Sequence, residues 1–185
     1  DHQKLSEQFI IDHKDKVYWN VICWGQKLSE PFIDEHFEKL KINIDHIIRK
    51  QKLSENFIRK YYDKLSPLAK IEVQKKQKLS EDFIRDFENK IDWNLICYYQ
   101  KLSENFIDQY FHKVNKYIIS KRQVLSEDFI IRKKEFLDWK AISKYQKLSE
   151  SFIEKYKEKL HMHLIFKYQE LSNQFYINHI EDVIF

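Results

Sequence analysis

The segment Gln-Lys-Leu-Ser-Glu-x-Phe-Ile recurs along the chain with small variations, and this repetition constrains the fold more than any other feature. Its eight copies are separated by 23, 25, 26, 23, 23, 23 and 23 residues and begin at Gln3, Gln26, Gln51, Gln77, Gln100, Gln123, Gln146 and Gln169. A period in this range is typical of a repeat array, in which each unit packs on its neighbours.

Each copy predicts the start of a helix, which we call helix A. Ser6 stands at the N-cap, where its hydroxyl can accept a hydrogen bond from an early backbone N–H, and Glu7 complements the helix dipole. Leu5 and Ile10 have the spacing of a hydrophobic staple. Apolar residues follow at positions 3, 4, 7 and 11 after the cap, so we expect one helix face to extend over all four positions.

A second, shorter helix, helix B, is predicted before each following Gln. An aliphatic residue always lies four positions before that Gln, and three repeats carry a Trp early in the helix. Core packing is the favoured interpretation of Trp19, Trp93 and Trp139. The expected helix B caps are Asn43, Asp92, Asn115 and Asp138.

Irregular positions carry further expectations. Gly25 is expected to close the first helix B in a left-handed conformation. Repeats two and three carry their extra residues between helix A and helix B. In repeat three Ala69 occupies the cap position, so its helix B is the least secure of the predicted helices.

One repeat cannot fold alone. Five or six buried side chains contribute roughly 10–12 kcal/mol, whereas ordering 23 residues costs at least about 1 kcal/mol each. We therefore predict an all-α fold, an α-solenoid of seven tandem two-helix repeats plus a terminal capping helix. It would form a single elongated helical-repeat domain over residues 1–185.

Composition excludes several classes of protein. One Gly and two Pro in 185 residues exclude glycine-rich phosphate loops and turn-rich β architectures. No apolar run approaches 18 residues and no secretory signal opens the chain, so we expect no membrane segment. Cys23 and Cys97 are expected to be half-buried thiols, which favours a reducing, cytoplasmic compartment.

Basic residues gather where helix B meets the next helix A, and repetition would place them along one edge. Cations at a helix C-terminus are also favoured by the dipole alone, and the net charge is only +4. Aromatic residues near the same links add a candidate contact surface, which includes Trp24 and Tyr168. The candidate partner-binding residues are Arg49, Lys50, Lys75, Lys76, Tyr98, Tyr99, Lys121, Arg122, Lys144 and Tyr145.

No pattern of residues points to catalysis. The recurring Ser and Glu are explained as cap and dipole partners, and His161-Met162-His163 lacks further converging metal ligands. We therefore predict no enzymatic activity, no cofactor, no metal and no small-molecule substrate.

The octamer from Gln100 to Ile107, with Asp92-Trp93-Asn94-Leu95-Ile96-Cys97-Tyr98-Tyr99 before it, resembles short tandem repeats of about 23 residues in proteins of giant DNA viruses. The resemblance covers nearly the whole chain and carries no catalytic motif. It implies a viral protein that acts inside an infected host cell.

These observations favour a scaffold that binds a protein partner through the surface of its stacked helices. The first alternative is nucleic-acid binding through the basic ridge at the links between repeats. The second is a structural protein whose arrays associate end to end through Ile184 and Phe185.

Overall fold

The computed structural model describes residues 3–179, and the regular secondary structure in this range is helical throughout. The predicted α-solenoid of tandem two-helix repeats is confirmed. The chain forms two compact units, residues 1–100 and residues 101–185, which are described one at a time. A single elongated domain stays a prediction, and Ile184 and Phe185 lie outside the described residues.

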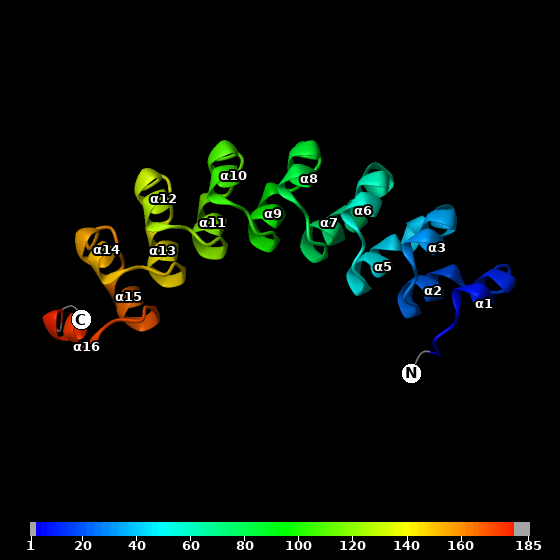
Figure 1. Cartoon of the computed structure of the whole chain (residues 1–185), viewed down its shortest axis with the longest axis horizontal. Helices are drawn as coiled ribbons and strands as arrows, with labels where there is room; N and C mark the ends of the chain where they lie inside the picture. Colours follow the sequence, from blue (N-terminus) through cyan, green and yellow to red (C-terminus); the bar gives the residue numbers. More distant parts are fainter. Residues whose placement is uncertain (1–2, 180–185) are drawn as a thin grey trace. The chain divides into compact units, whose positions relative to one another are not determined.

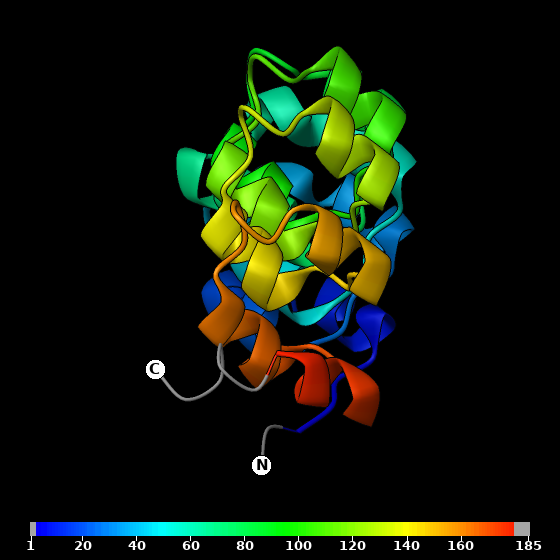
Figure 2. The ribbon, with the colours of Figure 1, turned by 90° about the vertical axis from the view of Figure 1, so that its left-hand side faces the viewer.

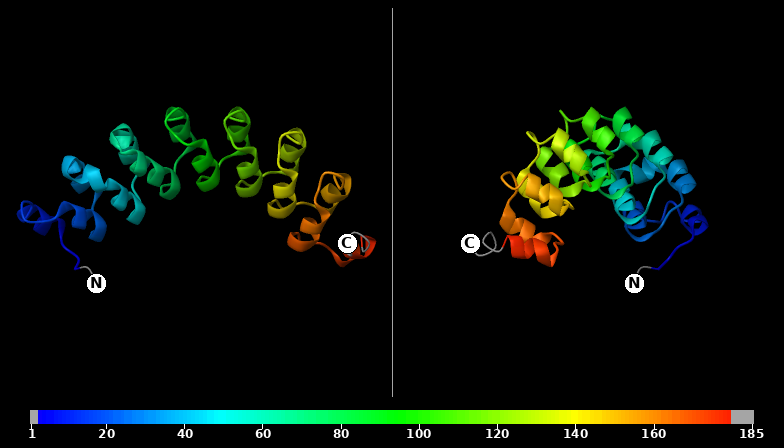
Figure 3. Two further views of the ribbon diagram at one scale, coloured as in Figure 1. Left: turned by 180° about the vertical axis from the view of Figure 1, so that it is seen from behind. Right: turned by 60° about the vertical axis from the view of Figure 1, so that its left-hand side comes forward.

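In the first unit the helices form two layers, with α3, α6 and α8 in one and α2, α5, α7 and α9 in the other (Figures 1 and 3). The elements are α1 (Glu7–Asp12), α2 (Trp19–Gly25), α3 (Glu30–Glu35), α4 (Phe37–Leu40), η1 (Lys41–Asn43), α5 (Ile44–Lys50), α6 (Glu55–Tyr61), η2 (Tyr62–Lys64), α7 (Pro67–Lys76), α8 (Glu81–Asp86) and α9 (Trp93–Tyr99).

The second unit has the same two layers. Helices α11, α13 and α15 pack against one another in chain order, and α10, α12 and α14 lie on the other side, as two views at right angles show (Figures 1 and 2). The elements are α10 (Glu104–Gln109), α11 (Lys116–Arg122), α12 (Glu127–Arg132), α13 (Trp139–Tyr145), α14 (Glu150–Lys155), α15 (Met162–Tyr168) and α16 (Asn173–Asn178).

All eight recurring serines cap a helix A as predicted. The cap backbone is extended, and the Ser Oγ accepts a hydrogen bond from the N–H of the third following residue, as in Ser126 with Phe129 at 3.1 Å. In helix B, Asp92, Asn115 and Asp138 cap in the same way. Asn43 occupies the N-cap position of α5 without a side-chain hydrogen bond to the helix.

Helix A is shorter than the apolar period predicts. In α10 the helix ends at Gln109, and a turn follows in which Lys113 N and Val114 N both donate to the carbonyl of Tyr110, at 2.8 and 3.1 Å. The apolar residue at position 11 nevertheless reaches the core, and Val114 is buried. The turn keeps nearly helical spacing while it redirects the chain toward helix B, so the sequence period continues past the end of the helix.

Three local expectations were wrong. Gly25 is the last residue of α2 and has no positive φ, because the helix ends on an extended Gln26. The second helix of repeat three, α7, forms as predicted, but Ser66 caps it in place of Ala69, so it begins at Pro67 and has ten residues. Cys23 and Cys97 are fully buried thiols.

The core is built from the repeated positions. The Phe and Ile at positions 3 and 4 of helix A are buried in most repeats, as in Phe129 and Ile130, and so is the helix B aliphatic, as in Ile142. Trp139 is only half-buried; its ring packs on Tyr156 of the following repeat, with centroids 5.9 Å apart, and its indole N–H donates to the carbonyl of Lys134 at 2.8 Å.

Each recurring Gln hydrogen-bonds the link of the preceding repeat. Gln146 is typical: its Oε1 accepts from Leu125 N at 2.9 Å, and its Nε2 donates to the carbonyls of Ser120 and Gln123, both at 2.8 Å. These contacts satisfy the exposed carbonyls at a helix C-terminus and an amide that has no partner within the link. The members of this glutamine row are Gln26, Gln51, Gln77, Gln100, Gln123, Gln146 and Gln169.

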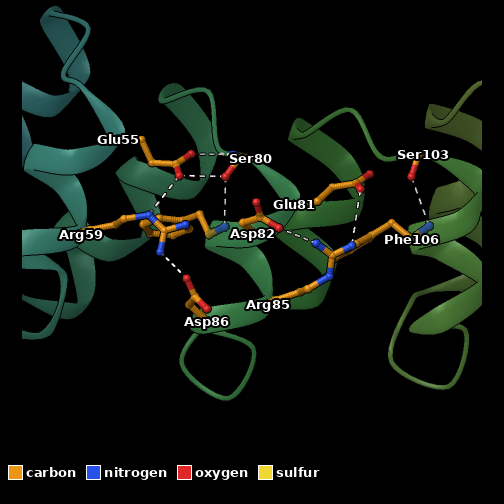
Figure 4. A network of polar contacts seen from close by, with 10 residues as sticks. Glu55, Arg59, Ser80, Glu81, Asp82, Arg85, Asp86, Ser103 and Phe106 are labelled. Carbon is orange, nitrogen blue, oxygen red and sulfur yellow. Dashed lines mark hydrogen bonds and ion pairs between the residues drawn. The ribbon is translucent and has the colours of Figure 1, made fainter.

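The first-turn Glu of one repeat holds the cap Ser of the next. Glu55 accepts from Ser80 N at 2.7 Å and from Ser80 Oγ at 2.8 Å, and it also pairs with Arg59 (Figure 4). Burial raises the pKa of the Glu55 carboxyl, but the hydrogen bonds from Ser80 and Arg59 outweigh it, so the pKa lies below its ordinary value of 4.5. The Glu therefore joins consecutive repeats as well as complementing its own helix dipole.

Candidate functional site

A row of lysines and tyrosines follows the C-terminal turns of helix B in the second unit. We call it the lysine–tyrosine strip and define it as Tyr117, Lys121, Lys144, Tyr145, Lys167 and Tyr168. Lysine is favoured in the last turn of a helix by the negative end of the dipole.

Consecutive lysines of the strip share the ring of a tyrosine. Lys121 Nζ lies 5.2 Å from the centroid of the Tyr145 ring and Lys144 Nζ lies 5.1 Å from it. Lys144 Nζ also lies 4.8 Å from the Tyr168 centroid, and Lys167 Nζ lies 5.4 Å from the same centroid. These cation–ring distances connect α11, α13 and α15 into one continuous surface.

The strip presents ammonium groups and phenol hydroxyls, which are positively charged or neutral hydrogen-bond donors. A hydrogen bond between Lys144 and Tyr145 raises the pKa of the ammonium and lowers the pKa of the phenol. No ion pair within residues 3–179 involves Lys121, Lys144 or Lys167. The three ammonium groups therefore have no ion-paired carboxylate among the described residues.

A shallow pocket of about 270 Å³ opens on the strip between α13 and α15. Lys144, Tyr145, Lys147 and Tyr168 line it, and Glu170 is the acidic residue in its wall. Six of its lining side chains, two Lys, two Tyr and two Gln, carry N–H or O–H donors, so an anionic group fits it better than a neutral apolar one.

Several cations on the helix A side of both units instead pair with carboxylates of a neighbouring repeat. Lys60 Nζ lies 2.6 Å from Asp34, and Arg59 bridges Glu55 and Asp86 (Figure 4). In the second unit Lys159 lies 3.1 Å from Glu135, and Lys133 pairs with Asp108. Asp34, Asp86, Asp108 and Glu135 come from a neighbouring repeat, and Glu55 comes from the same helix as Arg59. Most of these ion pairs therefore join one repeat to the next.

The same helix B turns in the first unit carry cations that already have partners. Arg49 pairs with Asp45 at 3.5 Å and with Glu72 at 3.2 Å. Lys50 donates to the carbonyl of Trp24, and its Nζ lies 4.8 Å from the Trp24 ring. These two predicted site residues are therefore engaged within the unit.

The remaining predicted residues are placed along the same turns. Lys75 is half-buried and Lys76 exposed at the end of α7, while Tyr98 and Tyr99 are exposed at the end of α9 with ring centroids 4.7 Å apart. Arg122 is exposed at the end of α11. Of the ten predicted residues, the structure brings Lys121, Lys144 and Tyr145 together in the strip.

Sequence reasoning overlooked Tyr117 and the glutamine row. Tyr117 lies one turn before Lys121 on α11, and its ring centroid is 5.7 Å from Lys121 Nζ. The i, i+4 spacing of the two residues on a helix could have predicted this contact. The Gln recurs without exception in a link between helices. A link alone does not require one particular polar side chain, so this invariance could have indicated a contact between repeats.

Other chemistry finds little support in the part of the chain that the structure describes. No group of three or more His, Cys, Asp or Glu side chains within residues 3–179 could hold a metal ion. Burial raises the pKa of the Cys23 thiol to about 11, which suppresses the reactive thiolate. Between residues 3 and 179, every helix falls short of the length and apolar character that crossing a bilayer requires.

Comparison of the chain with protein-family models, with curated proteins and with solved structures found no match.

Proposed function

We propose that this chain is a non-enzymatic helical-repeat scaffold that binds a protein partner through the helix B edge of its second unit. The observation that supports the proposal is the lysine–tyrosine strip. Its lysines have no ion-paired carboxylate in residues 3–179, whereas several cations on the helix A side pair with carboxylates of a neighbouring repeat.

The composition of the strip suits a protein interface. Tyrosine is enriched at such interfaces because a rigid ring supplies contact area at low entropic cost and its hydroxyl remains available for hydrogen bonding. Tyr145 and Tyr168 are 43% and 44% exposed, so each ring can still be covered by a partner. Repetition of the same group on three helices also lets weak contacts act together.

The test compares two triple variants with equal loss of charge. Lys121→Ala/Lys144→Ala/Lys167→Ala removes the lysines of the strip, and Lys134→Ala/Lys155→Ala/Lys159→Ala removes three exposed lysines on the helix A side of the same unit. Affinity capture from nuclease-treated cell extract should recover a common protein with the wild type and the control variant, and lose it with the strip variant. Equal recovery by both variants, or no protein specific to the wild type, would contradict the proposal.

Nucleic-acid binding is the second candidate, because lysines alternating with exposed aromatic rings also occur in single-strand binding surfaces. The affinity for an oligonucleotide should then fall steeply with salt, by roughly one power of the salt concentration per phosphate contact. Absence of binding to any oligonucleotide at low salt would eliminate this candidate.

End-to-end self-association through Ile184 and Phe185 is a third candidate. Sedimentation velocity at high protein concentration tests it, and a monomer throughout would contradict it. From the resemblance of the repeat to those of giant DNA viruses, we further propose that the chain acts in the cytoplasm of an infected cell. Recovery of its coding sequence from a cellular genome would contradict that assignment.

A further inference from the structure

The strip presents one lysine per repeat at a regular interval. Lys121, Lys144 and Lys167 occupy the same position of α11, α13 and α15, and these helices pack directly on one another. Packed helices lie about 8–10 Å apart. A ligand that follows the strip therefore meets an ammonium group at roughly this interval.

Two tyrosine rings of the strip already have cations beside them. The rings of Tyr145 and Tyr168 each have two ammonium groups within 5.4 Å of their centroids. A nucleobase would have to displace these cations to stack on the rings, whereas a carboxylate can bind the ammonium groups and the phenol hydroxyls without moving them. The arrangement thus favours carboxylates over bases.

An extended peptide can match this interval. In a polyproline II helix each residue rises about 3.1 Å and three residues complete a turn, so every third side chain lies on one face at intervals of about 9 Å. An acidic residue at every third position would place its carboxylates beside successive lysines of the strip.

We propose that the lysine–tyrosine strip binds an extended acidic segment of a partner protein in which Asp or Glu recurs at every third residue. This inference rests on the proposed function, since it specifies the chemistry of the protein partner. The charge of the strip and the interval of its lysines are the two features that select this ligand.

The probes are fluorescein-labelled peptides with capped ends, tested with the full chain by fluorescence anisotropy at low salt. One contains four Glu-Pro-Pro units, and a second has the same composition with its four Glu adjacent. The periodic peptide should bind about tenfold more tightly than the second one, as expected when several exposed ion pairs form rather than one. A labelled oligothymidylate serves as the nucleic-acid probe and should bind more weakly than the periodic peptide.

Variants connect this binding to the strip. Lys121→Ala/Lys144→Ala/Lys167→Ala should weaken binding of the periodic peptide by about tenfold or more, and Lys134→Ala/Lys155→Ala/Lys159→Ala should not. The charge reversal Lys121→Glu/Lys144→Glu/Lys167→Glu should gain binding to a Lys-Pro-Pro peptide, which also demonstrates that the variant is folded.

Equal affinity for the two acidic peptides, tighter binding of the oligothymidylate, or unchanged binding by the strip variant would overturn the inference. Failure of the inference differs from failure of the proposed function. If neither peptide binds but the strip variant still loses the captured protein, only the choice of ligand is wrong. If the strip variant keeps that protein, the proposed function itself is wrong.

Discussion

The glutamine row and the lysine–tyrosine strip both lie near the ends of helix B in the second unit. They differ in how far their polar groups are buried and hydrogen-bonded within the protein. In this unit Gln123 and Gln146 of the glutamine row are buried and Gln169 is half-buried, and the amide of Gln146 bonds to three backbone groups of the preceding repeat. The lysine–tyrosine strip, one or two residues earlier in each repeat, is half-buried or exposed, and its lysines contact tyrosines but no carboxylate in residues 3–179.

The difference separates stability from binding. A buried polar group without a partner costs about 1–3 kcal/mol, so loss of a Gln leaves groups that water cannot reach. An exposed lysine is solvated with or without a partner, and its removal costs the fold little. Substitution in the glutamine row should therefore change stability, and substitution in the strip should change binding.

The largest effect is expected for Gln146→Ala. It leaves Leu125 N and the carbonyls of Ser120 and Gln123 without their side-chain partner, so the free energy of unfolding should fall by about 2–5 kcal/mol. Urea denaturation followed by circular dichroism measures it. The control is Gln109→Ala at an exposed position, for which the change should stay within about 0.5 kcal/mol. Equal losses of stability at both positions would contradict the structural role assigned to the glutamine row.

A smaller loss is expected for Ser126→Ala. Ser126 Oγ accepts from Phe129 N at 3.1 Å and donates to Glu104 Oε2 at 3.0 Å, so the change removes both a cap and a contact between repeats. The free energy of unfolding should fall by about 1–2 kcal/mol in the same urea assay. Asn105→Ala, at an exposed position inside α10, is the control, and a loss at Asn105 as large as that at Ser126 would contradict the role of the cap.

Acid should weaken the contacts between repeats. Because the pKa of Glu55 in the folded chain lies below its ordinary value of 4.5, the ionised carboxylate stabilises the fold above that pH, and this stabilisation is lost as the pH falls through the folded-state pKa. The stability difference between wild type and Glu55→Gln should therefore shrink when urea titrations are moved from about pH 6.5 to about pH 3.5. A difference that grows toward acid would reverse the assigned sign. At the exposed Glu158, replacement by Gln should change stability by less than about 0.5 kcal/mol.

The smallest effect on stability is expected for Lys144→Ala, which should leave the free energy of unfolding within about 0.5 kcal/mol of the wild type. Its effect should appear in Tyr145 instead. A hydrogen bond from Lys144 lowers the pKa of this phenol, so the variant should ionise Tyr145 at a higher pH, as a ¹³C NMR titration of the ring carbons can follow. An unchanged Tyr145 titration would remove this contact from the description of the strip.

Much of the fold could be predicted because the repeated octamer encodes local physics. Cap, dipole and apolar spacing all act within one turn of helix, so the starts at Ser6 through Ser172 follow from the residues themselves. The end of helix A could not be predicted in this way. The turn after Gln109 preserves the spacing that buries Val114, and the sequence period is the same on both sides of the helix end.

The sequence could predict the edge on which the candidate site lies, but not which of its basic residues are already paired. Repetition placed Lys121 and Lys144 on one edge, but the partners that engage Arg49 within its unit, Asp45 and Glu72, come from two different helices. Which lysines keep an unpaired charge therefore depends on tertiary contacts. The role of the glutamine row likewise depends on the link of the preceding repeat, which lies more than 20 residues away in sequence.

Native-state hydrogen exchange at Leu125 N tests the central claim most directly, because this amide lies in the link between α11 and α12 and donates to Gln146. The account predicts that it exchanges far more slowly than the amide of Val124, whose residue is 91% exposed, and that Gln146→Ala accelerates it by about 30-fold or more. Exchange of Leu125 at the rate of Val124 in the wild type would contradict the claim that the glutamine row holds consecutive repeats together.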